Sequence, residues 1–316
     1  MSKRLQSYIY LTATAAIWGI GAVVIKVTLD HLEPFTFLAY RFILTGLVVI
    51  PLFLIELQKH GVQLKQIPEM IKLDFFGVVL HLCLIFIGID LTSALEASVI
   101  LSMVPIFTII GGILFLREKV SKFEIWGVSI AVIGTALIVL EPIFSGESLQ
   151  FANVTGNLIL IGANITSTYF ALQSKIDLRN HYNPWMITLV GFLIAPIFFI
   201  PLSILEQPLN QLPAVISSIP ITAHLGVIYM SIISGIIAFY IRQLGFRDID
   251  ASEAGIFSYL NPVFGAPLAI LWLNESINTV FIIGTFLIIC GVILAEYKPL
   301  TRYHERRIPA IPRRHL

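Results

Sequence analysis

The sequence predicts an all-α membrane protein with ten transmembrane helices, built as two inverted five-helix repeats with both termini in the cytoplasm. The first observation behind this prediction is the composition. Hydrophobic residues make up 57% of the chain, charged residues 12%, and the mean hydropathy is +0.90. Soluble domains have about 45–50% apolar and about 25% charged residues. The lipid bilayer is therefore the expected surrounding of this chain, and nucleic acid is not an expected partner.

The second observation is a series of apolar runs. A helix needs roughly 17–25 mainly apolar residues to cross a bilayer. Ten such runs are predicted as spans: Ser7–Leu29, Pro34–Leu57, Ile71–Ile89, Ser93–Leu116, Phe123–Leu140, Val154–Ser174, Pro184–Leu205, Ile221–Gln243, Ala251–Leu273 and Ile277–Tyr297.

The distribution of cations supports this division. Of the 20 Lys and Arg residues, all but Lys26 and Arg41 are assigned to one side of the membrane. Cationic loops are retained in the cytoplasm, so both termini are expected there. The residues assigned to the cytoplasmic side are Lys3, Arg4, Lys59, Lys65, Lys72, Arg117, Lys119, Lys122, Lys175, Arg179, Arg242, Arg247, Lys298, Arg302, Arg306, Arg307, Arg313 and Arg314.

The third observation is an internal repeat. A shift of 157 positions superposes the stretch 96–142 on a later one without a gap, and it matches Glu96 with Glu253, Pro105 with Pro262, Gly127 with Gly284 and Gly134 with Gly291. Five spans are an odd number, so the second copy must be inverted relative to the first. Inverted repeats of this kind build many secondary transporters. The expected parts are a first repeat (7–141), an extracellular linker (142–153), a second repeat (154–297) and a basic cytoplasmic tail (298–316).

Several local features point to a family. Trp18-Gly19 lies in the first predicted span, Pro34 precedes Arg41 in the second, and the Pro, Glu and Gly pattern is doubled. With these features the chain resembles an EamA-type member of the drug/metabolite transporter superfamily. The resemblance implies an exporter or exchanger of small metabolites that works by alternating access. The second half departs from the first, because Ser167-Thr168-Tyr169 stands in place of Trp18-Gly19.

His81 is the strongest single candidate for a substrate-binding residue, because it lies near the middle of the third predicted span. An ionisable group inside a bilayer is costly and usually faces a cavity or a partner. His81 could contact substrate or take up a proton, or it could be a neutral histidine bonded to a nearby carbonyl or hydroxyl. The other predicted substrate-binding residues are polar or aromatic and lie at middle depths: Trp18, Ser102, Asn164, Thr168, Tyr169, Tyr240, Tyr259 and Asn261.

Further residues are candidates for gating. Arg41, Glu96 and Glu253 are predicted to form gating or structural ion pairs, with Asp30 and Asp90 as other partners for Arg41. Helix capping alone would also explain the two glutamates, since a carboxylate in a first helical turn is favoured by the helix dipole. Pro105 and Pro262 are expected to kink their spans and to act as hinges.

The predicted function is therefore secondary transport, with export of amino acids or drug-like amphipathic metabolites across the cell membrane favoured. A nucleotide-sugar or phosphorylated-sugar exchanger is the alternative. An intramembrane enzyme is less favoured, because neither a His-Glu-x-x-His pattern nor a phosphate-binding Gly-rich Lys loop is present. A passive channel or scaffold is a third class. We expect no cofactor and no metal ion, and proton coupling and oligomeric state stay open.

Overall fold

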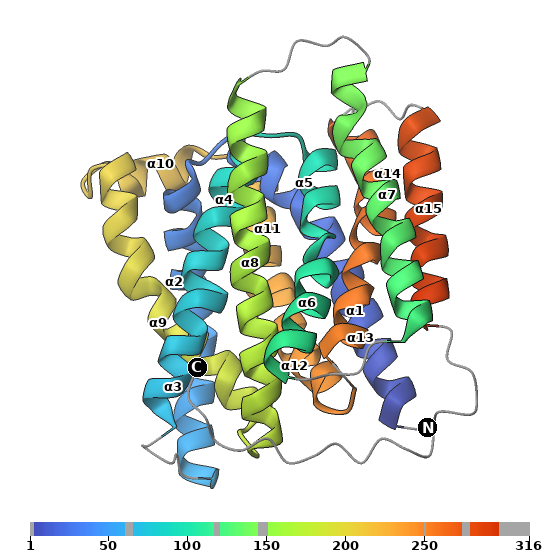
Figure 1. Cartoon of the computed structure of the whole chain (residues 1–316). Helices are drawn as coiled ribbons and strands as arrows, with labels where there is room; N and C mark the ends of the chain where they lie inside the picture. The colour runs from blue at the N-terminus through green and yellow to red at the C-terminus, as the bar shows by residue number, and fades with distance from the viewer. Residues whose placement is uncertain are drawn as a thin grey trace.

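The computed structural model describes residues 3–60, 66–116, 121–144, 151–249, 251–273 and 279–296. These residues form a bundle of helices without strands (Figure 1). Six of the described stretches are long and apolar enough to cross a membrane: Lys3–Leu29, Pro34–Lys59, Ile67–Asp90, Pro184–Glu206, Ile221–Arg247 and Ala254–Leu273. The count of ten spans and the cytoplasmic location of the termini stay predictions.

The helices of the first half of the chain are α1 (Lys3–Leu29), α2 (Pro34–His60), α3 (Ile67–Asp74), η1 (Phe75–Leu80), α4 (His81–Asp90), α5 (Ala94–Leu101), α6 (Val104–Leu116) and α7 (Lys122–Phe144). Those of the second half are α8 (Phe151–Arg179), α9 (Pro184–Glu206), α10 (Leu212–Ser218), α11 (Ile221–Ile228), η2 (Tyr229–Ile237), α12 (Ala238–Arg247), α13 (Ala251–Ile256), η3 (Phe257–Leu260), α14 (Asn261–Leu273) and α15 (Thr279–Glu296).

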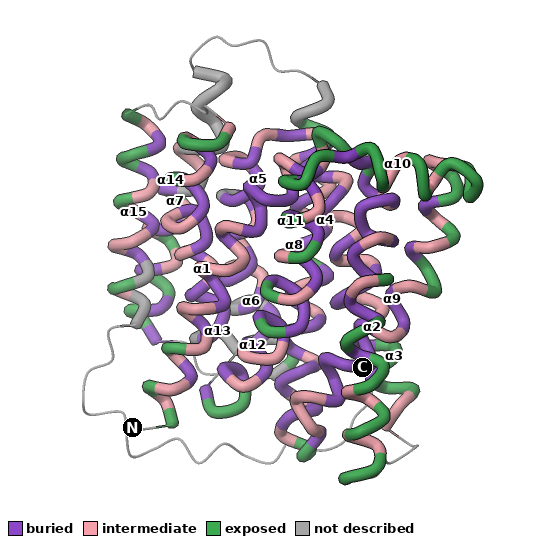
Figure 2. The backbone as a smooth tube through the Cα atoms, turned by 180° about the vertical axis from the view of Figure 1, so that it is seen from behind, coloured by how far each residue is buried: buried purple, intermediate pink, exposed green. Residues whose placement is uncertain are grey.

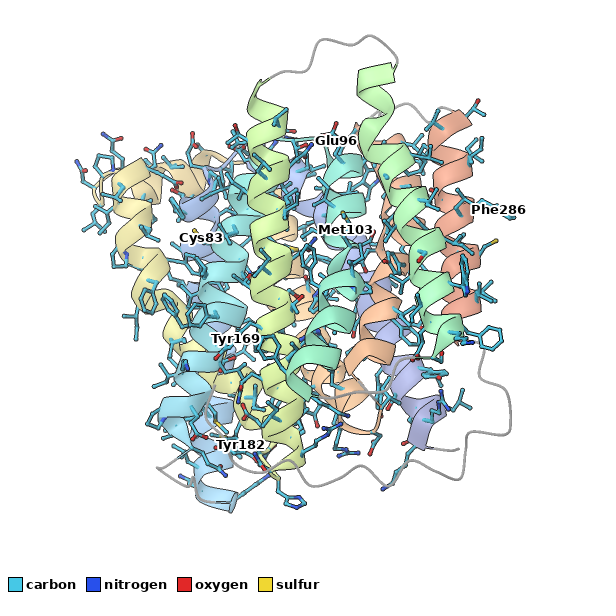
Figure 3. All side chains as sticks on the ribbon, viewed as in Figure 1. Cys83, Glu96, Met103, Tyr169, Tyr182 and Phe286 are labelled. Carbon is cyan, nitrogen blue, oxygen red and sulfur yellow. The ribbon has the colours of Figure 1, made fainter. Side chains whose placement is uncertain are left out.

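Helices from the two halves interleave. In the centre, α1 packs against α12 and α14, while α8 packs against α4 and α6. At the two sides, α2 packs against α9 and α7 against α15. Figure 2 shows that the buried residues lie mainly on the inner helices, whereas exposed residues gather on outer surfaces and on α10. Phe286, which is 64% exposed, projects outward from α15 (Figure 3). Any site in the centre is therefore walled by both halves.

The contact between α7 and α15 is made by glycines. A Cβ atom built on Gly134 would lie 2.5 Å from the carbonyl oxygen of Gly284, and one built on Gly291 would overlap the carbonyl oxygen of Gly127. Under the 157-residue shift, Gly127 matches Gly284 and Gly134 matches Gly291. The contact is thus reciprocal, as it is between the two sides of a two-fold interface.

Helix interruptions also recur at matching positions. The π-helix η1 ends at Leu80 and η2 ends at Ile237, which are 157 residues apart. The gap between α5 and α6 is likewise matched by the 3₁₀ segment η3. Pro105 and Pro262 each lie in the first turn after an interruption, where a proline breaks no intrahelical hydrogen bond. The expected kink in a continuous helix is therefore replaced by a break that precedes each proline.

Candidate functional site

A cavity of about 90 Å³ lies in the centre of the bundle. Its wall is drawn from both halves: Trp18, Gly21, Ala22, Ile25, Arg41, His81, Leu82, Ile85, Ile89, Leu101, Val104, Asn164, Ser167, Met230, Ser234, Phe239, Arg242, Ser258 and Asn261. The helix interruptions surround it, since His81 follows η1, Ser234 lies in η2 and Ser258 lies in η3. Such interruptions are common at functional sites because they free backbone groups and redirect side chains.

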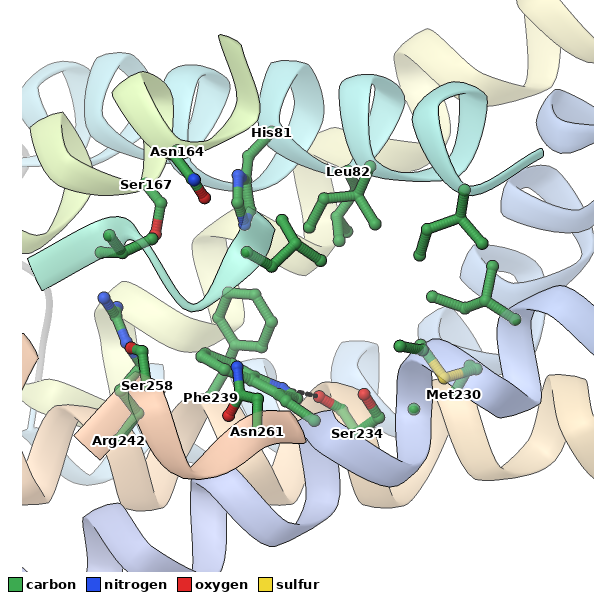
Figure 4. A pocket seen from close by; sticks show the side chains of 18 of the residues that line it. His81, Leu82, Asn164, Ser167, Met230, Ser234, Phe239, Arg242, Ser258 and Asn261 are labelled. Atoms are coloured by element: carbon green, nitrogen blue, oxygen red, sulfur yellow. Dashed lines mark hydrogen bonds between the residues drawn. The ribbon is translucent and has the colours of Figure 1, made fainter. Parts of the chain in front are cut away.

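The cavity wall has a mainly polar end and a mainly aliphatic end, and Arg41 and Ser234 also line it. In Figure 4, Arg242, Ser258, Ser167, Asn164 and His81 gather on one side, whereas Leu82 and Met230 lie toward the other. The far end is formed by residues further along α1 and α4, namely Ile25, Ile85 and Ile89.

Lys26 is bonded to the end of α4, next to the aliphatic end of the cavity, but it does not line the cavity. Its Nζ donates hydrogen bonds of 3.0 Å to the carbonyl oxygens of Ile89 and Asp90, at the C-terminus of α4. The cation is thus satisfied by the last carbonyls of a helix, which also favour positive charge. Lys26 is therefore a structural cation at the end of α4 and is not part of the cavity wall.

His81 uses one ring nitrogen for the protein. Its Nδ1 lies 2.9 Å from the carbonyl oxygen of Ala163 and 3.2 Å from Oγ1 of Thr166. A carbonyl can only accept, so Nδ1 carries the proton, and in the neutral ring Nε2 is then an acceptor. No described residue bonds to Nε2. The histidine therefore combines both interpretations, because it is anchored to α8 and still lines the cavity with a free acceptor.

Trp18 links α1 to the interrupted helix η2. Its Nε1 donates a 3.1 Å hydrogen bond to the carbonyl oxygen of Ser234, and the hydroxyl of Tyr229 donates a 2.7 Å bond to the carbonyl oxygen of Ile17. The indole also packs edge-on against Phe239, with ring centroids 5.3 Å apart. These contacts hold the indole in one orientation as part of the cavity wall.

Two asparagines complete the polar lining. Nδ2 of Asn164 donates a 2.5 Å hydrogen bond to the carbonyl oxygen of Ile100, next to the break between α5 and α6. Its Oδ1, like Oδ1 of Asn261, is buried and has no hydrogen-bond partner in the described structure. Buried polar atoms are normally paired, so both oxygens are available to a ligand or to water.

Two arginines line the cavity, and both are almost completely buried. Arg41 is 1% exposed and Arg242 is 6% exposed. The Arg242 guanidinium lies over the rings of Trp18, Phe170 and Phe246 at 4.5–5.6 Å from their centroids. That of Arg41 lies 5.3 Å from Phe42 and 5.9 Å from Phe86. Among the described residues, neither side chain forms an ion pair or a hydrogen bond.

The sequence profile of the EamA-like transporter family matches residues 5–140 and again residues 154–297. The chain belongs to this family. It is accordingly a multi-pass protein of the cell membrane, and its relatives are named as uncharacterized transporters and as a probable amino-acid metabolite efflux pump.

Two relatives and one solved structure illustrate the range of similarity. The uncharacterized transporter YetK of Bacillus subtilis strain 168 is 28% identical over 94% of this chain and 89% of its own length. A probable amino-acid metabolite efflux pump of Salmonella typhimurium strain LT2 is 23% identical, over 87% of this chain and 90% of its own length. A crystal structure of a protein with 19% sequence identity shares the fold, with a TM-score of 0.72 over 93% of this chain and 97% of its own.

In this EamA family member, four of the nine predicted substrate-binding residues line the cavity: Trp18, His81, Asn164 and Asn261. The other five lie elsewhere. Tyr169 packs against Phe76, Tyr240 against Trp185, and Tyr259 is fully buried in a cluster with Ala131, Phe281 and Ile288. Ser102 and Thr168 are buried outside the cavity wall. Figure 3 shows Tyr169 well away from Met103, which lies near the middle of the bundle.

These differences are differences of helical phase. Ser167 lines the cavity where Thr168 and Tyr169 were predicted to, and Ser258 lines it where Tyr259 was predicted to. Neighbouring residues on a helix point about 100° apart, so a one-residue step moves a side chain off the wall. Arg242 was also missed, because it was counted as a cytoplasmic loop cation.

The predicted ion pair of Arg41 with Glu96, Asp90 or Asp30 is not formed in this conformation. The Glu96 carboxylate accepts hydrogen bonds from Oγ1 of Thr92 and, at 3.3 Å, from Nδ2 of Asn157, and Oγ of Ser93 accepts one from the Glu96 amide. This geometry is that of a helix cap. Glu253 lies in α13, but its side chain is outside the described part of the structure.

The described residues offer no obvious metal site. No three His, Cys, Asp or Glu side chains within the described ranges gather closely enough to hold a metal ion. The cavity wall instead provides two guanidinium groups, unpaired amide oxygens and an imidazole acceptor, which are groups that bind an organic solute.

Proposed function

We propose that this protein is a secondary transporter that exports small amphipathic metabolites, amino acids among them, by alternating access. The observation that carries the proposal is the central cavity, because its wall is shared by both halves of the chain and is built at the helix interruptions. Family membership and the relative named as a probable amino-acid metabolite efflux pump support the same class of solute.

Ten spans in two inverted repeats form part of the proposal. It is supported by the two separate matches of the family profile, by the reciprocal glycine contact between α7 and α15, and by the matching positions of η1 and η2. Inverted repeats allow alternating access because the two halves can exchange conformations around one shared site. Arg41, Glu96 and Glu253 are retained as proposed gating residues, and the segments before Pro105 and Pro262 as proposed hinges.

Exchange of phosphorylated solutes is the second candidate function. It is favoured by the two buried arginines, since planar guanidinium groups bind phosphate and carboxylate oxygens in pairs. It is opposed by the aliphatic part of the cavity wall, because Ile25, Leu82, Ile85 and Ile89 offer no partners for the hydroxyl groups of a sugar.

Flux measurements in proteoliposomes test the proposal. Radiolabelled leucine and glucose 6-phosphate would be followed in both directions, with and without a pH gradient. Ala22→Phe fills the cavity from α1, and Leu47→Phe adds bulk at a position that is 70% exposed and serves as the control. We expect leucine flux that Ala22→Phe abolishes and Leu47→Phe retains. Equal flux through both variants would refute transport through this cavity, and flux of the phosphate ester alone would favour the second candidate.

A further inference from the structure

The cavity wall carries two cationic side chains and no anionic one. Arg41 and Arg242 are both among the lining residues, and none of the described lining residues is Asp or Glu. A buried charge is costly unless a counter-charge or hydrogen-bonding groups compensate it. In membrane proteins such groups mark substrate or ion pathways. An anionic ligand would supply the compensation that the described protein residues do not.

Arg242 is better placed than Arg41 to contact such a ligand. It lines the main cavity and also a smaller neighbouring cavity of about 20 Å³. Figure 4 shows it beside Ser258 and below Ser167, two hydroxyls that can donate to the same anion. By contrast, Nε and Nη1 of Arg41 are enclosed by protein without a partner.

The aromatic rings around Arg242 hold its guanidinium in place without neutralising it. Trp18, Phe170 and Phe246 attract a cation through their π-faces but do not compete for its N–H groups. The donors of the guanidinium are therefore oriented and free, which lowers the entropic cost of binding a planar carboxylate.

The aliphatic residues of the wall determine which kind of body the ligand can have beyond its carboxylate. Beyond the polar end lie Leu82, Ile85, Ile89 and Ile25, which offer dispersion contacts and no hydrogen bonds. A hydrocarbon body fits this end, and a polyhydroxylated one does not. For an ammonium group beside the carboxylate, the wall provides the Nε2 acceptor of His81 and two amide oxygens but no counter-charge.

We propose that the cavity binds a small amphipathic organic acid, with its carboxylate on Arg242 and its hydrocarbon body against Leu82 and Ile85, and that an α-ammonium group weakens binding. This inference rests on the proposed transport function. It narrows the substrate class to amphipathic carboxylic acids, among which those without an α-ammonium group bind most tightly. The ammonium group weakens binding because it adds positive charge close to a buried guanidinium.

A ligand series with one carbon skeleton tests the charge preference. 4-Methylpentanoate is an anion, 4-methylpentanamide is neutral, leucine is a zwitterion and leucinamide is a cation. Binding to the detergent-solubilised wild-type protein would be measured by isothermal titration calorimetry. We expect 4-methylpentanoate to bind at least about tenfold more tightly than its amide, because a charge-assisted hydrogen bond is lost in the amide. Leucine should bind more weakly than 4-methylpentanoate, and leucinamide most weakly.

Three variants locate the charge that is responsible. Arg242→Gln should reduce the carboxylate-to-amide ratio to about one. Arg247→Gln is the matched control on the same helix, because its side chain is 51% exposed and pairs with Asp248 at 3.3 Å. Arg247→Gln should keep the wild-type ratio, and Arg41→Gln should lower it less than Arg242→Gln does. If Arg242→Gln cannot be purified in folded form, the series on the wild-type protein and on Arg41→Gln still decides the charge preference and the role of Arg41.

The inference is overturned if the amide binds as tightly as the carboxylate, if leucine binds more tightly than 4-methylpentanoate, or if Arg41→Gln removes the ratio and Arg242→Gln keeps it. These outcomes can be distinguished from a failure of the proposed transport function. Proteoliposome flux of leucine or leucinamide without a preference for carboxylates would leave transport intact and remove only the carboxylate assignment. Absence of flux for every solute, with carboxylate binding retained, would remove transport and keep the assignment.

Discussion

The glycine contact between α7 and α15 gives a test of both the packing and the internal symmetry. A Cβ atom at Gly134 would lie 2.5 Å from the Gly284 carbonyl oxygen and 2.9 Å from Cβ of Leu287. A Cβ atom at Gly291 would lie 2.8 Å from the amide nitrogen of Ala131 and 3.0 Å from its Cβ. These neighbours are backbone or Cβ atoms, so no side-chain rotation can relieve the overlap.

The size of the effect follows from these distances. Non-bonded heavy atoms are most stable about 3.5–4.0 Å apart, so alanine at either position forces the two helices to separate by roughly 1 Å. Overpacking of this kind costs about 1–3 kcal/mol. Gly46 is the control, because a Cβ atom built there meets no heavy atom within 4 Å. Gly46→Ala should be neutral or should stabilise its helix by up to about 1 kcal/mol.

The assay is unfolding by sodium dodecyl sulfate from a mild detergent, followed by circular dichroism. We expect Gly134→Ala and Gly291→Ala to lower the free energy of unfolding by similar amounts, because the two positions are equivalent under the 157-residue shift. If either variant proved as stable as Gly46→Ala, the close contact would not exist in the molecule. A large effect at one position alone would contradict the symmetry of the contact.

Three further predictions concern single side chains. Lys26→Met should destabilise the protein by about 1–2 kcal/mol, because two carbonyls at the end of α4 lose their donor. It should leave the affinity for 4-methylpentanoate unchanged. A selective loss of this affinity in calorimetry would show that Lys26 contacts substrate. His181→Gly should raise the free energy of unfolding by about 1 kcal/mol, because His181 has a φ of 63° at the end of α8; an unchanged detergent-unfolding midpoint would argue against that backbone conformation. His81→Ala should lower solute flux in proteoliposomes at least tenfold and should also lower the free energy of unfolding. His81→Asn, which can still donate to the carbonyl oxygen of Ala163, should recover the free energy of unfolding but not the flux. Recovery of full flux by His81→Asn would rule out a substrate contact through Nε2.

The sequence predicted how deep in the bundle the site lies better than it predicted which face of each helix lines the cavity. Apolar length and the 157-residue shift fix which segments are helical and which residues lie at middle depth. They do not fix how each helix is rotated, because an almost wholly apolar helix has no strong polar face to orient it. Trp18 and Asn261 therefore line the cavity, whereas Tyr169 and Tyr259 are one or two residues away from the lining serines.

Arg242 shows a second limit of sequence reasoning. The assignment of cations to cytoplasmic loops counted both Arg242 and Lys175 among the loop residues, yet both lie in helices and are buried within the protein. Lys175 donates to the carbonyl oxygens of Phe246, in the last turn of α12, and of Ile249, just beyond that helix. The available signal was the span boundary itself, since the predicted range Ile221–Gln243 already contained Arg242. A cation inside its own predicted span is better treated as a site candidate than as a topology marker.

The 157-residue shift also relates the two sides of the cavity wall. Four pairs of matched positions both line it: Leu82 with Phe239, Ile85 with Arg242, Leu101 with Ser258, and Val104 with Asn261. In three of these pairs the first half supplies an aliphatic residue and the second half a polar one. The scaffold is thus repeated while the wall chemistry is not.

This division of chemistry explains how one repeated scaffold can produce an oriented site. Had both halves kept the same residues, the wall would be polar or apolar at both ends, and a ligand could lie in two opposite directions. Arg242, Ser258 and Asn261 of the second half stand at the positions of Ile85, Leu101 and Val104, so the polar groups at these three pairs of matched positions come from one half only. An amphipathic acid would then bind in a single direction, with Arg242 at its head, while the matching backbones of the two halves keep the interruptions that surround it.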